Sequence, residues 1–374
     1  MRTAICERLG VEFPLFAFSH CRDVVAAVTN AGGFGVLGAV AYSPERLDKE
    51  LAWIDARVGG RPYGVDVLVP GKVDESALDR RAHLMDFVPE RHRDFVTHLL
   101  SKYGVSAPPQ PLSAVADEFG RRVTAAGATG LIDVALKHPI GLIASALGPP
   151  PPEMVAKARE AGVPVAALVG TVEHARRQVA AGADIVVAQG TEAGGHTGEI
   201  STMVLVPQVV DAVAPVPVLA AGGIASGRQM AAAMALGAEG VWCGSVWLTT
   251  EEAETSQAVK DKLLAASSLD TVRSRSRTGK PARQLRSAWT DEWDAGPESP
   301  GPLGMPLQML VAEGAMARIG AAADRGDPGA VELVNYFVGQ VVGQLDQVRP
   351  AKDVVYAMVS EFADAVERLG RLSG

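Results

Sequence analysis

Residues 216–245, VPVLAAGGIASGRQMAAAMALGAEGVWCGS, contain two short apolar runs that each end in glycine. The first run ends at the pair Gly222–Gly223, and a helical segment starts shortly afterwards at Ser226. The second run ends at Gly244–Ser245. An apolar strand, a helix and a second apolar strand in succession indicate parallel pairing in a sheet that is buried on both faces.

The same alternation runs through most of the first 250 residues. Apolar runs alternate with amphipathic segments, one of which has a strong helix start in Ser43 and Pro44. Strands are expected at residues 13–18, 34–40, 63–70, 141–147, 163–169, 184–188, 215–224 and 240–245. This number of strand–helix units closes an α/β (β/α)8 TIM barrel. A doubly wound open sheet is the competing arrangement, because strand boundaries are imprecise at this level.

Two further regions accompany the predicted barrel of residues 1–250. Residues 71–127 are charged and punctuated by proline, with one amphipathic helix at 89–105, and we expect an insertion or lid there. Residues 251–374 are expected to be a mainly helical C-terminal region that packs on the barrel. Its helices are expected at 305–326, 327–348 and 350–370.

Composition narrows the class of protein. The 374 residues, 48% hydrophobic and 21% charged, are those of an ordinary globular protein, and the net charge of −8 argues against nucleic-acid or membrane partners. Cys6, Cys21 and Cys243 have no metal-ligand spacing, and no signal peptide or membrane span is evident. We therefore expect a cytoplasmic protein with reduced thiols and no metal site. A homo-oligomer is compatible with the sequence, which leaves the oligomeric state open.

Three glycine-containing loops follow predicted strands. The stretch QGTEAGGHTG, residues 189–198, places His196 among four glycines directly after an apolar strand. A histidine at the carboxyl end of a barrel strand is a candidate catalytic group, whereas a structural role would be to bond a carbonyl in a tight turn. The loops at Gly222–Gly223 and Trp242–Ser245 follow the last two strands, where barrels often bind phosphate at a helix start.

These motifs carry a family resemblance. VVAQGTEAGGHTG at 186–198, the stretch 216–245 and GKPARQLRSAWTDEW at 279–293 together resemble the nitronate monooxygenase family, once called 2-nitropropane dioxygenases. The similarity extends from about Phe13 to the C-terminus and is weakest at 71–127. It implies an FMN-dependent (β/α)8 barrel.

The resemblance also implies roles for particular residues. His196 matches the active-site histidine beside the flavin ring. Asp66 stands where the family usually has asparagine, and a carboxylate there would repel an anionic reduced flavin unless it is protonated or paired. The residues expected to bind the cofactor are Ala17, Phe18, Asp66, Gln189, Gly194, Gly222, Gly223, Trp242, Cys243, Gly244 and Ser245.

The activity implied by the resemblance is oxidation of alkyl nitronates, or nitroalkanes, with O2 to a carbonyl compound and nitrite. His196 would bind the anionic nitronate if protonated, or remove the α-proton of a nitroalkane if neutral. Three alternatives stay open: an FMN-dependent NAD(P)H reductase of quinones or enoyl thioesters, a non-flavin phosphate-binding barrel, and a binding or regulatory protein without turnover.

Overall fold

Eight parallel strands close into a barrel. The structure, a computed structural model, describes residues 2–40, 42–68, 87–105 and 125–372. The strands of the barrel are, in order around it, β1 (Leu15–Ser19), β2 (Phe34–Gly38), β3 (Gly64–Leu68), β4 (Leu142–Ala146), β5 (Val165–Val169), β6 (Ile185–Gln189), β8 (Val218–Ala221) and β9 (Gly240–Cys243). Because β9 pairs with β1, the sheet has no free edge. This confirms the TIM barrel and excludes the open sheet.

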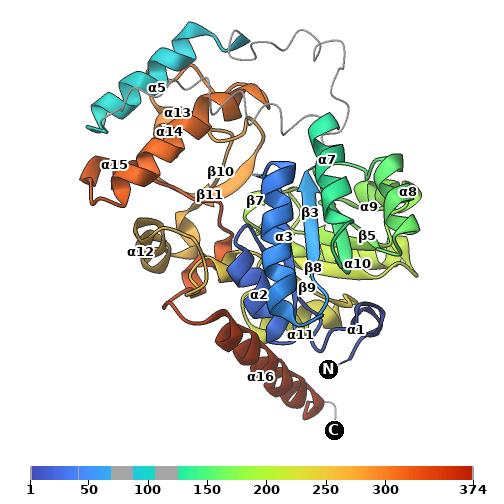
Figure 1. The fold of residues 1–374 in the computed structure, drawn as a ribbon. Coiled ribbons are helices and arrows are strands. Elements are labelled where there is room, and N and C mark those ends of the chain that lie inside the picture. Colours follow the sequence, from blue (N-terminus) through green and yellow to red (C-terminus); the bar gives the residue numbers. More distant parts are fainter. Residues whose placement is uncertain (1, 41, 69–86, 106–124, 373–374) are drawn as a thin grey trace.

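Helices surround the barrel (Figure 1). They are α2 (Arg22–Asn30), α3 (Pro44–Val58), α7 (Ala125–Ala135), α8 (Pro152–Glu160), α9 (Val172–Ala180), α10 (Thr202–Val213) and α11 (Gly227–Ala235), with a short α1 (Ala4–Leu9) before the first strand. Their apolar faces cover the outward-facing side chains of the strands. The inward-facing side chains form a separate core, in which the Trp242 ring stacks on Phe16 with centroids 6.1 Å apart. None of the helices described is long and apolar enough to cross a membrane.

The start of α3 tests one local prediction. The Ser43 side chain accepts a hydrogen bond from the backbone N–H of Arg46 at 3.2 Å, and Pro44 occupies the first turn. Replacement of Ser43 by alanine should lower the free energy of unfolding by about 1 kcal/mol, because one helix N–H loses its acceptor. Denaturant titration measures this change. Ser43→Asp keeps an acceptor and should stay near the starting stability; an equal loss in both variants would contradict the capping role.

The C-terminal region adds helices and a small sheet. Its elements are a 3-10 turn η2 (Ser245–Trp247), α12 (Gln257–Ala265), η3 (Ser268–Asp270), β10 (Thr271–Ser274), β11 (Ala282–Leu285), α13 (Ala288–Ala295), α14 (Leu307–Ala323), α15 (Pro328–Leu333), η4 (Gln340–Gln344) and α16 (Ala351–Gly370). Helix α16 packs along α11 (Figure 1). Strand β11 pairs with β10 on one side and with β7 (Gly195–His196), which lies in the loop after β6, on the other.

The helix predicted over 327–348 is wrong beyond α15. The chain leaves the helix at Val334 and forms only the 3-10 turn η4 before α16. A Cβ on Gly339 would lie 2.6 Å from the carbonyl oxygen of Glu192, and one on Gly343 would lie 2.6 Å from the Ser268 nitrogen. Close backbone approach, rather than helix packing, is therefore the reason for these two glycines.

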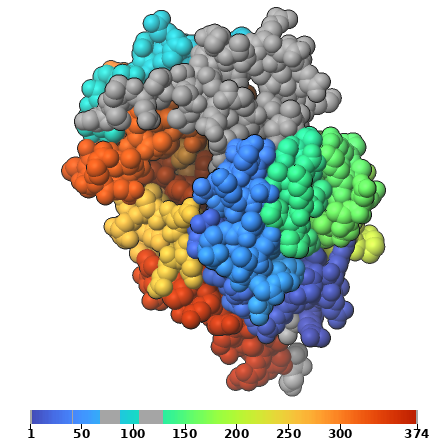
Figure 2. Space-filling model, viewed as in Figure 1, coloured from blue at the N-terminus to red at the C-terminus, as the bar shows by residue number. Residues whose placement is uncertain are grey.

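Within the predicted insertion the structure describes residues 87–105 and 125–127 only. The amphipathic helix is present as α5 (Glu90–Lys102). It packs on the C-terminal region, where the Phe95 ring meets Trp293 edge-on at 4.8 Å and Lys102 pairs with Glu292 at 2.6 Å. Figure 2 shows α5 in cyan beside the orange C-terminal segment, at one end of the molecule. The remainder of 71–127 lies outside the described residues, so its role as a lid stays a prediction.

Candidate active site

The three predicted loops meet at the carboxyl ends of the strands, called the rim below. The loop after β6 stays bonded to the end of the neighbouring strand β8, because the Gly190 N–H donates to the Ala221 carbonyl at 2.9 Å. A Cβ on Gly222 would lie 3.1 Å from both the nitrogen and the Cβ of Ala193. Strands β8 and β9 are hydrogen-bonded neighbours, so the loop that follows β9 begins beside the loop that follows β8. The rim therefore brings together the residues that the sequence grouped.

Free backbone donors mark the predicted phosphate loops. Gly222 and Gly223 have φ angles of +93° and +71°, which glycine adopts without strain. Within the described residues, the backbone N–H groups of Gly223 and Ser245 have no hydrogen-bond partner. Ser245 is also the first residue of η2, where a free N–H is expected. These loops, at Gly222–Gly223 and Trp242–Ser245, form a cradle with donors for an anion.

Backbone N–H groups at the start of α11 are already bonded within the protein. The Ser226 side chain caps the helix, and the Gly227 N–H donates to the Glu361 carboxylate at 2.9 Å. The Ala225 N–H donates to the Gln229 side chain at 2.8 Å. With these donors occupied, and with the negative charge of Glu361 already present, the end of this helix is a poor phosphate site.

Residues 338–340 form hydrogen bonds to the loop after β6 and to Ser245. The Gln340 N–H donates to the Glu192 carbonyl at 2.9 Å, and the Gly339 N–H donates to the Ser245 side chain at 2.8 Å. A Cβ on Gly194 would lie 2.9 Å from the Gly339 nitrogen, so only glycine fits there without displacement. The C-terminal region thus fixes the geometry of both the histidine loop and the cradle.

Glu192 has a structural role within this loop. Its carboxylate accepts hydrogen bonds from the backbone N–H of Thr202, at 3.0 and 3.1 Å, and from the Thr202 hydroxyl at 3.0 Å. Thr202 is the first residue of α10, where a negative charge is favourable. The carboxylate therefore ties the loop to this helix and is not directed at a substrate.

His196 is held in the small sheet. It pairs with Ala282 across β7 and β11, and its Nε2 lies 2.8 Å from the Thr278 hydroxyl oxygen. Burial, with a smaller effect of the positive charge of Lys280, lowers the pKa of His196 to about 4. The imidazole is therefore neutral at physiological pH. Thr278 and Lys280 lie outside the residues chosen from the sequence.

The hydrogen-bond network decides which imidazole nitrogen is basic. The Thr278 hydroxyl donates its hydrogen to the Lys280 carbonyl at 3.1 Å. It must then accept from His196, which places the imidazole proton on Nε2. No hydrogen bond from a described residue engages Nδ1, so its lone pair can accept a proton.

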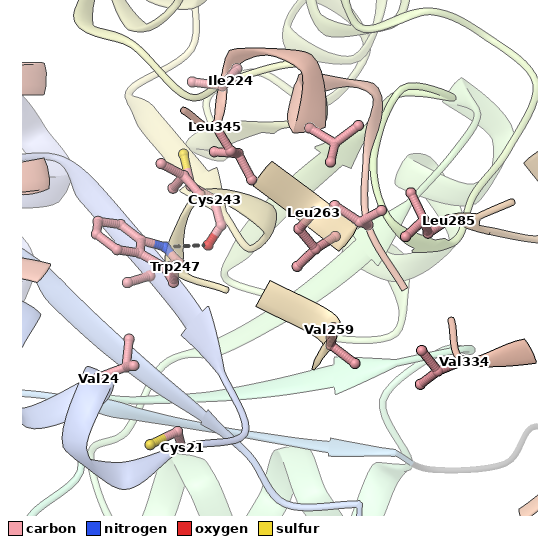
Figure 3. Close-up of a cluster of buried hydrophobic side chains, with 14 of the residues drawn as sticks. Cys21, Val24, Ile224, Cys243, Trp247, Val259, Leu263, Leu285, Val334 and Leu345 are labelled. Atoms are coloured by element: carbon pink, nitrogen blue, oxygen red, sulfur yellow. Dashed lines mark hydrogen bonds between the residues drawn. The ribbon is translucent and has the colours of Figure 1, made fainter. Parts of the chain in front are cut away.

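Four of the predicted cofactor-binding side chains face the barrel interior near the rim: Phe18, Asp66, Gln189 and Trp242. Because side chains alternate along a strand, Ala17 and Cys243 face outward into the helix layer. Figure 3 shows Cys243 in that cluster beside Trp247, whose Nε1 donates to the Cys243 carbonyl at 2.8 Å. Burial also raises the pKa of Cys243 to about 12. A cofactor contact from these two residues would be limited to backbone atoms.

Asp66 and His20 lie on neighbouring parts of the rim. The His20 Nδ1 is 3.0 Å from the Gly38 carbonyl, and Gly38 is the register partner of Asp66. His20 is exposed to solvent, yet protein atoms pack closely around its ring and lower its pKa. Asp66 is only 5% exposed, and burial raises its pKa to about 8. The repulsion of a reduced flavin that the sequence raised therefore does not arise at pH 7, because this carboxyl is neutral there.

The described residues contain two further candidate features, a cluster of possible metal ligands and a cavity. Cys21, Asp23 and Glu254 place ligand atoms within 4.8 Å of one another. The Cys21 thiol donates to the Glu252 carbonyl at 3.0 Å, and burial raises its pKa. A cavity of about 310 Å³ lies at the opposite end of β8 and β9, beside α1, and carries no paired catalytic groups.

The closed parallel barrel, with His196 and the glycine loops at its rim, has the architecture of a TIM barrel. Comparison with known proteins identifies the family. The model of the nitronate monooxygenase family matches residues 11–361, and the chain belongs to this family.

Relatives and solved structures agree with this assignment. The chain is 62% identical to the Mycobacterium tuberculosis protein named "Putative monooxygenase Rv1533", over 99% of this chain and 98% of that protein. A structure of nitroalkane oxidase from Streptomyces ansochromogenes superposes with a TM-score of 0.78 at 27% identity, covering 98% of this chain and 100% of that one. FabK from Thermotoga maritima superposes with a TM-score of 0.71 at 27% identity, covering 100% and 99%. The protein is an oxidoreductase, and these likenesses support a flavin cofactor.

Proposed function

We propose that the protein is an FMN-dependent enzyme that oxidises alkyl nitronates, or nitroalkanes, with O2 to a carbonyl compound and nitrite. The observation that carries the proposal is a neutral His196, held with Nδ1 free, at the rim of a barrel of the nitronate monooxygenase family. The nitroalkane oxidase of similar fold supports the choice of substrate class.

The residues at the rim fit FMN. The unbonded N–H groups of Gly223 and Ser245 would hold the phosphate. Gln189 and Asp66 offer polar groups, and Phe18 offers apolar surface, for the ring. Bound FMN would supply the electron acceptor and the reaction with O2.

The protein's own contribution is to position and to move a proton. His196 Nδ1 would remove the α-proton of a nitroalkane, because the imidazole is neutral. The positive charge of Lys280 lies close enough to lower the pKa of His196, and the same charge would favour an anionic nitronate beside the ring. When nitronate itself is the substrate, no proton has to be removed, so His196 is not needed as a base.

Spectra and anaerobic mixing test the proposal. The purified chain, or the chain after addition of FMN, should show the absorbance of a bound flavin, and an alkyl nitronate should bleach it in the absence of O2. Reduction by NADH or NADPH but not by nitronate would favour the reductase of quinones or enoyl thioesters. A colourless chain that takes up no FMN would favour the non-flavin barrel.

Thr278 should affect turnover through His196. Thr278→Val removes the hydroxyl that positions Nε2, and a misplaced base costs up to about 10²-fold in turnover with a nitroalkane. Thr278→Ser keeps the hydroxyl and should restore most of the rate. With nitronate, which needs no deprotonation, the loss in Thr278→Val should be smaller. Steady-state kinetics with both substrates measure this, and equal losses with both would argue for a purely structural role.

A further inference from the structure

Asp66 is a buried carboxyl with no bonding partner in the part of the chain that the structure describes. Its side chain lies on the interior face of β3, since Val65 and Val67 face the outer helices. It is 5% exposed, and no hydrogen bond or ion pair to another described residue satisfies it. Its register partners, Gly38 and Ala144, have no polar side chains. A polar group buried in this way costs stability unless something bonds to it.

The surroundings of Asp66 contain few charges. The inward-facing residues of the adjacent strands β2 and β4 are apolar in the described part of the chain. His20, at the end of β1, is the nearby titratable group, and its Nδ1 is engaged by the Gly38 carbonyl. Helix α7 packs on the outer face of β3, where Asp133 pairs with Lys157 at 2.6 Å. Burial alone raises the pKa of Asp66, to about 8.

The position of Asp66 relates it to the cradle. In the closed order of eight strands, β3 is the fourth strand from β8 in either direction, so the two lie across the barrel from each other. A ligand whose phosphate is held after β8 and β9, and whose ring extends over the barrel, therefore has its far edge toward β3.

We propose that Asp66 binds the cofactor as a neutral carboxylic acid, with its O–H donating to a ring carbonyl and its C=O accepting from the adjacent ring N–H of the flavin. This inference rests on the proposed function. A neutral carboxyl carries one donor and one acceptor side by side, which complement an imide edge of the form O=C–N–H. A carboxylate could only accept, and it would repel the ring carbonyl. The neutral Asp66 side chain thus offers the same donor and acceptor pattern as the side-chain amide of asparagine.

The pH dependence follows from this assignment. Only the neutral acid is competent to bind, so the contribution of Asp66 to FMN affinity should be constant below about pH 7 and fall as the carboxyl ionises above pH 8. The FMN phosphate itself titrates at about pH 6, which the comparison of variants at each pH cancels. Well above the pKa, each further pH unit lowers the competent fraction about tenfold. Binding of the ring stabilises the neutral form and moves the transition to higher pH in the complex.

The experiment is FMN binding, followed by quenching of flavin fluorescence from pH 6 to 9.5, with the unaltered chain, Asp66→Asn and Asp66→Leu. Asp66→Asn keeps the donor and acceptor but cannot ionise, so it should bind as tightly at pH 6 and lose the decline above pH 8. Asp66→Leu should bind weakly at every pH. Riboflavin, which lacks the phosphate, should give the same ratio between the unaltered chain and Asp66→Asn at each pH.

Each outcome decides something. A ratio of affinities between the unaltered chain and Asp66→Asn that does not change with pH would overturn the inference, as would tight binding by Asp66→Leu. Circular dichroism of each variant checks that it is folded. If the unaltered chain binds no FMN at any pH, the proposed function fails and this inference fails with it.

Discussion

Replacement of His196 by asparagine is expected to lower turnover with a nitroalkane by about 10²- to 10⁴-fold while FMN stays bound. The reason is the loss of a general base, because Nδ1 is the atom left free by the bond between Nε2 and Thr278. Stopped-flow reduction of the flavin under anaerobic conditions measures the step directly. His174→Asn is the matched control, since His174 is an exposed histidine on α9. Unchanged reduction by nitroalkane in His196→Asn would remove the histidine from the mechanism.

The pH profile offers a second test of His196. A base must be unprotonated, and an ordinary histidine would lose activity below about pH 6.5. With the pKa lowered to about 4, the base remains competent to about pH 5, so kcat/KM should show no acid limb near pH 6.5. A limb near pH 6.5 that disappears in His196→Asn would show that the imidazole is not desolvated as its burial implies.

The barrel could be predicted because its signal is local and repeated. Most barrel strands are apolar runs bounded by glycine or proline, and some helices bring their own start signal, as at Ser43. Parallel strands buried on both faces give this pattern in any sequence. The family motifs placed His196 and the glycine loops at the rim for the same reason, because strand ends follow from the strands.

The partners of these residues could not be predicted, because they come from distant parts of the chain. Thr278 lies 82 positions from His196, in a basic stretch with no strand pattern. The pairing of β11 with a strand of two residues leaves no periodicity to detect. Glu361, which occupies the start of α11, is 134 positions from Gly227. The contact between the start of α11 and Glu361 therefore becomes visible only in the fold.

The segment around Gly339 was expected to be helical, and the structure shows that it is not. The segment is rich in glycine and valine, which have low helix propensity. The chain instead approaches the backbone of Glu192 too closely for any side chain at Gly339. Glycines at such positions serve the active site, because they let residues 338–340 hold the histidine loop.

Gly190 is the glycine of this loop whose substitution should be most damaging. A Cβ at this position would overlap the hydroxyl and backbone nitrogen of Thr202 and approach the Glu192 carboxylate to 2.6 Å. Thr202 is the first residue of α10, and its hydroxyl oxygen also lies 2.9 Å from the Gly222 carbonyl oxygen. Gly190→Ala must therefore displace the link between the histidine loop, α10 and the cradle.

The expected cost of Gly190→Ala is about 3 kcal/mol in the free energy of unfolding, since backbone and a capped helix start cannot move aside cheaply. Affinity for FMN should fall together with stability, because the same displacement moves Gly222. Thermal and denaturant unfolding, with FMN titration at a temperature where the variant is folded, measure both effects. Gly320→Ala is the control: it lies inside α14 with open space around a Cβ, and it should be neutral or slightly stabilising. If Gly190→Ala were as stable as Gly320→Ala and bound FMN normally, the loop would not be fixed by the contact between Gly190 and Thr202.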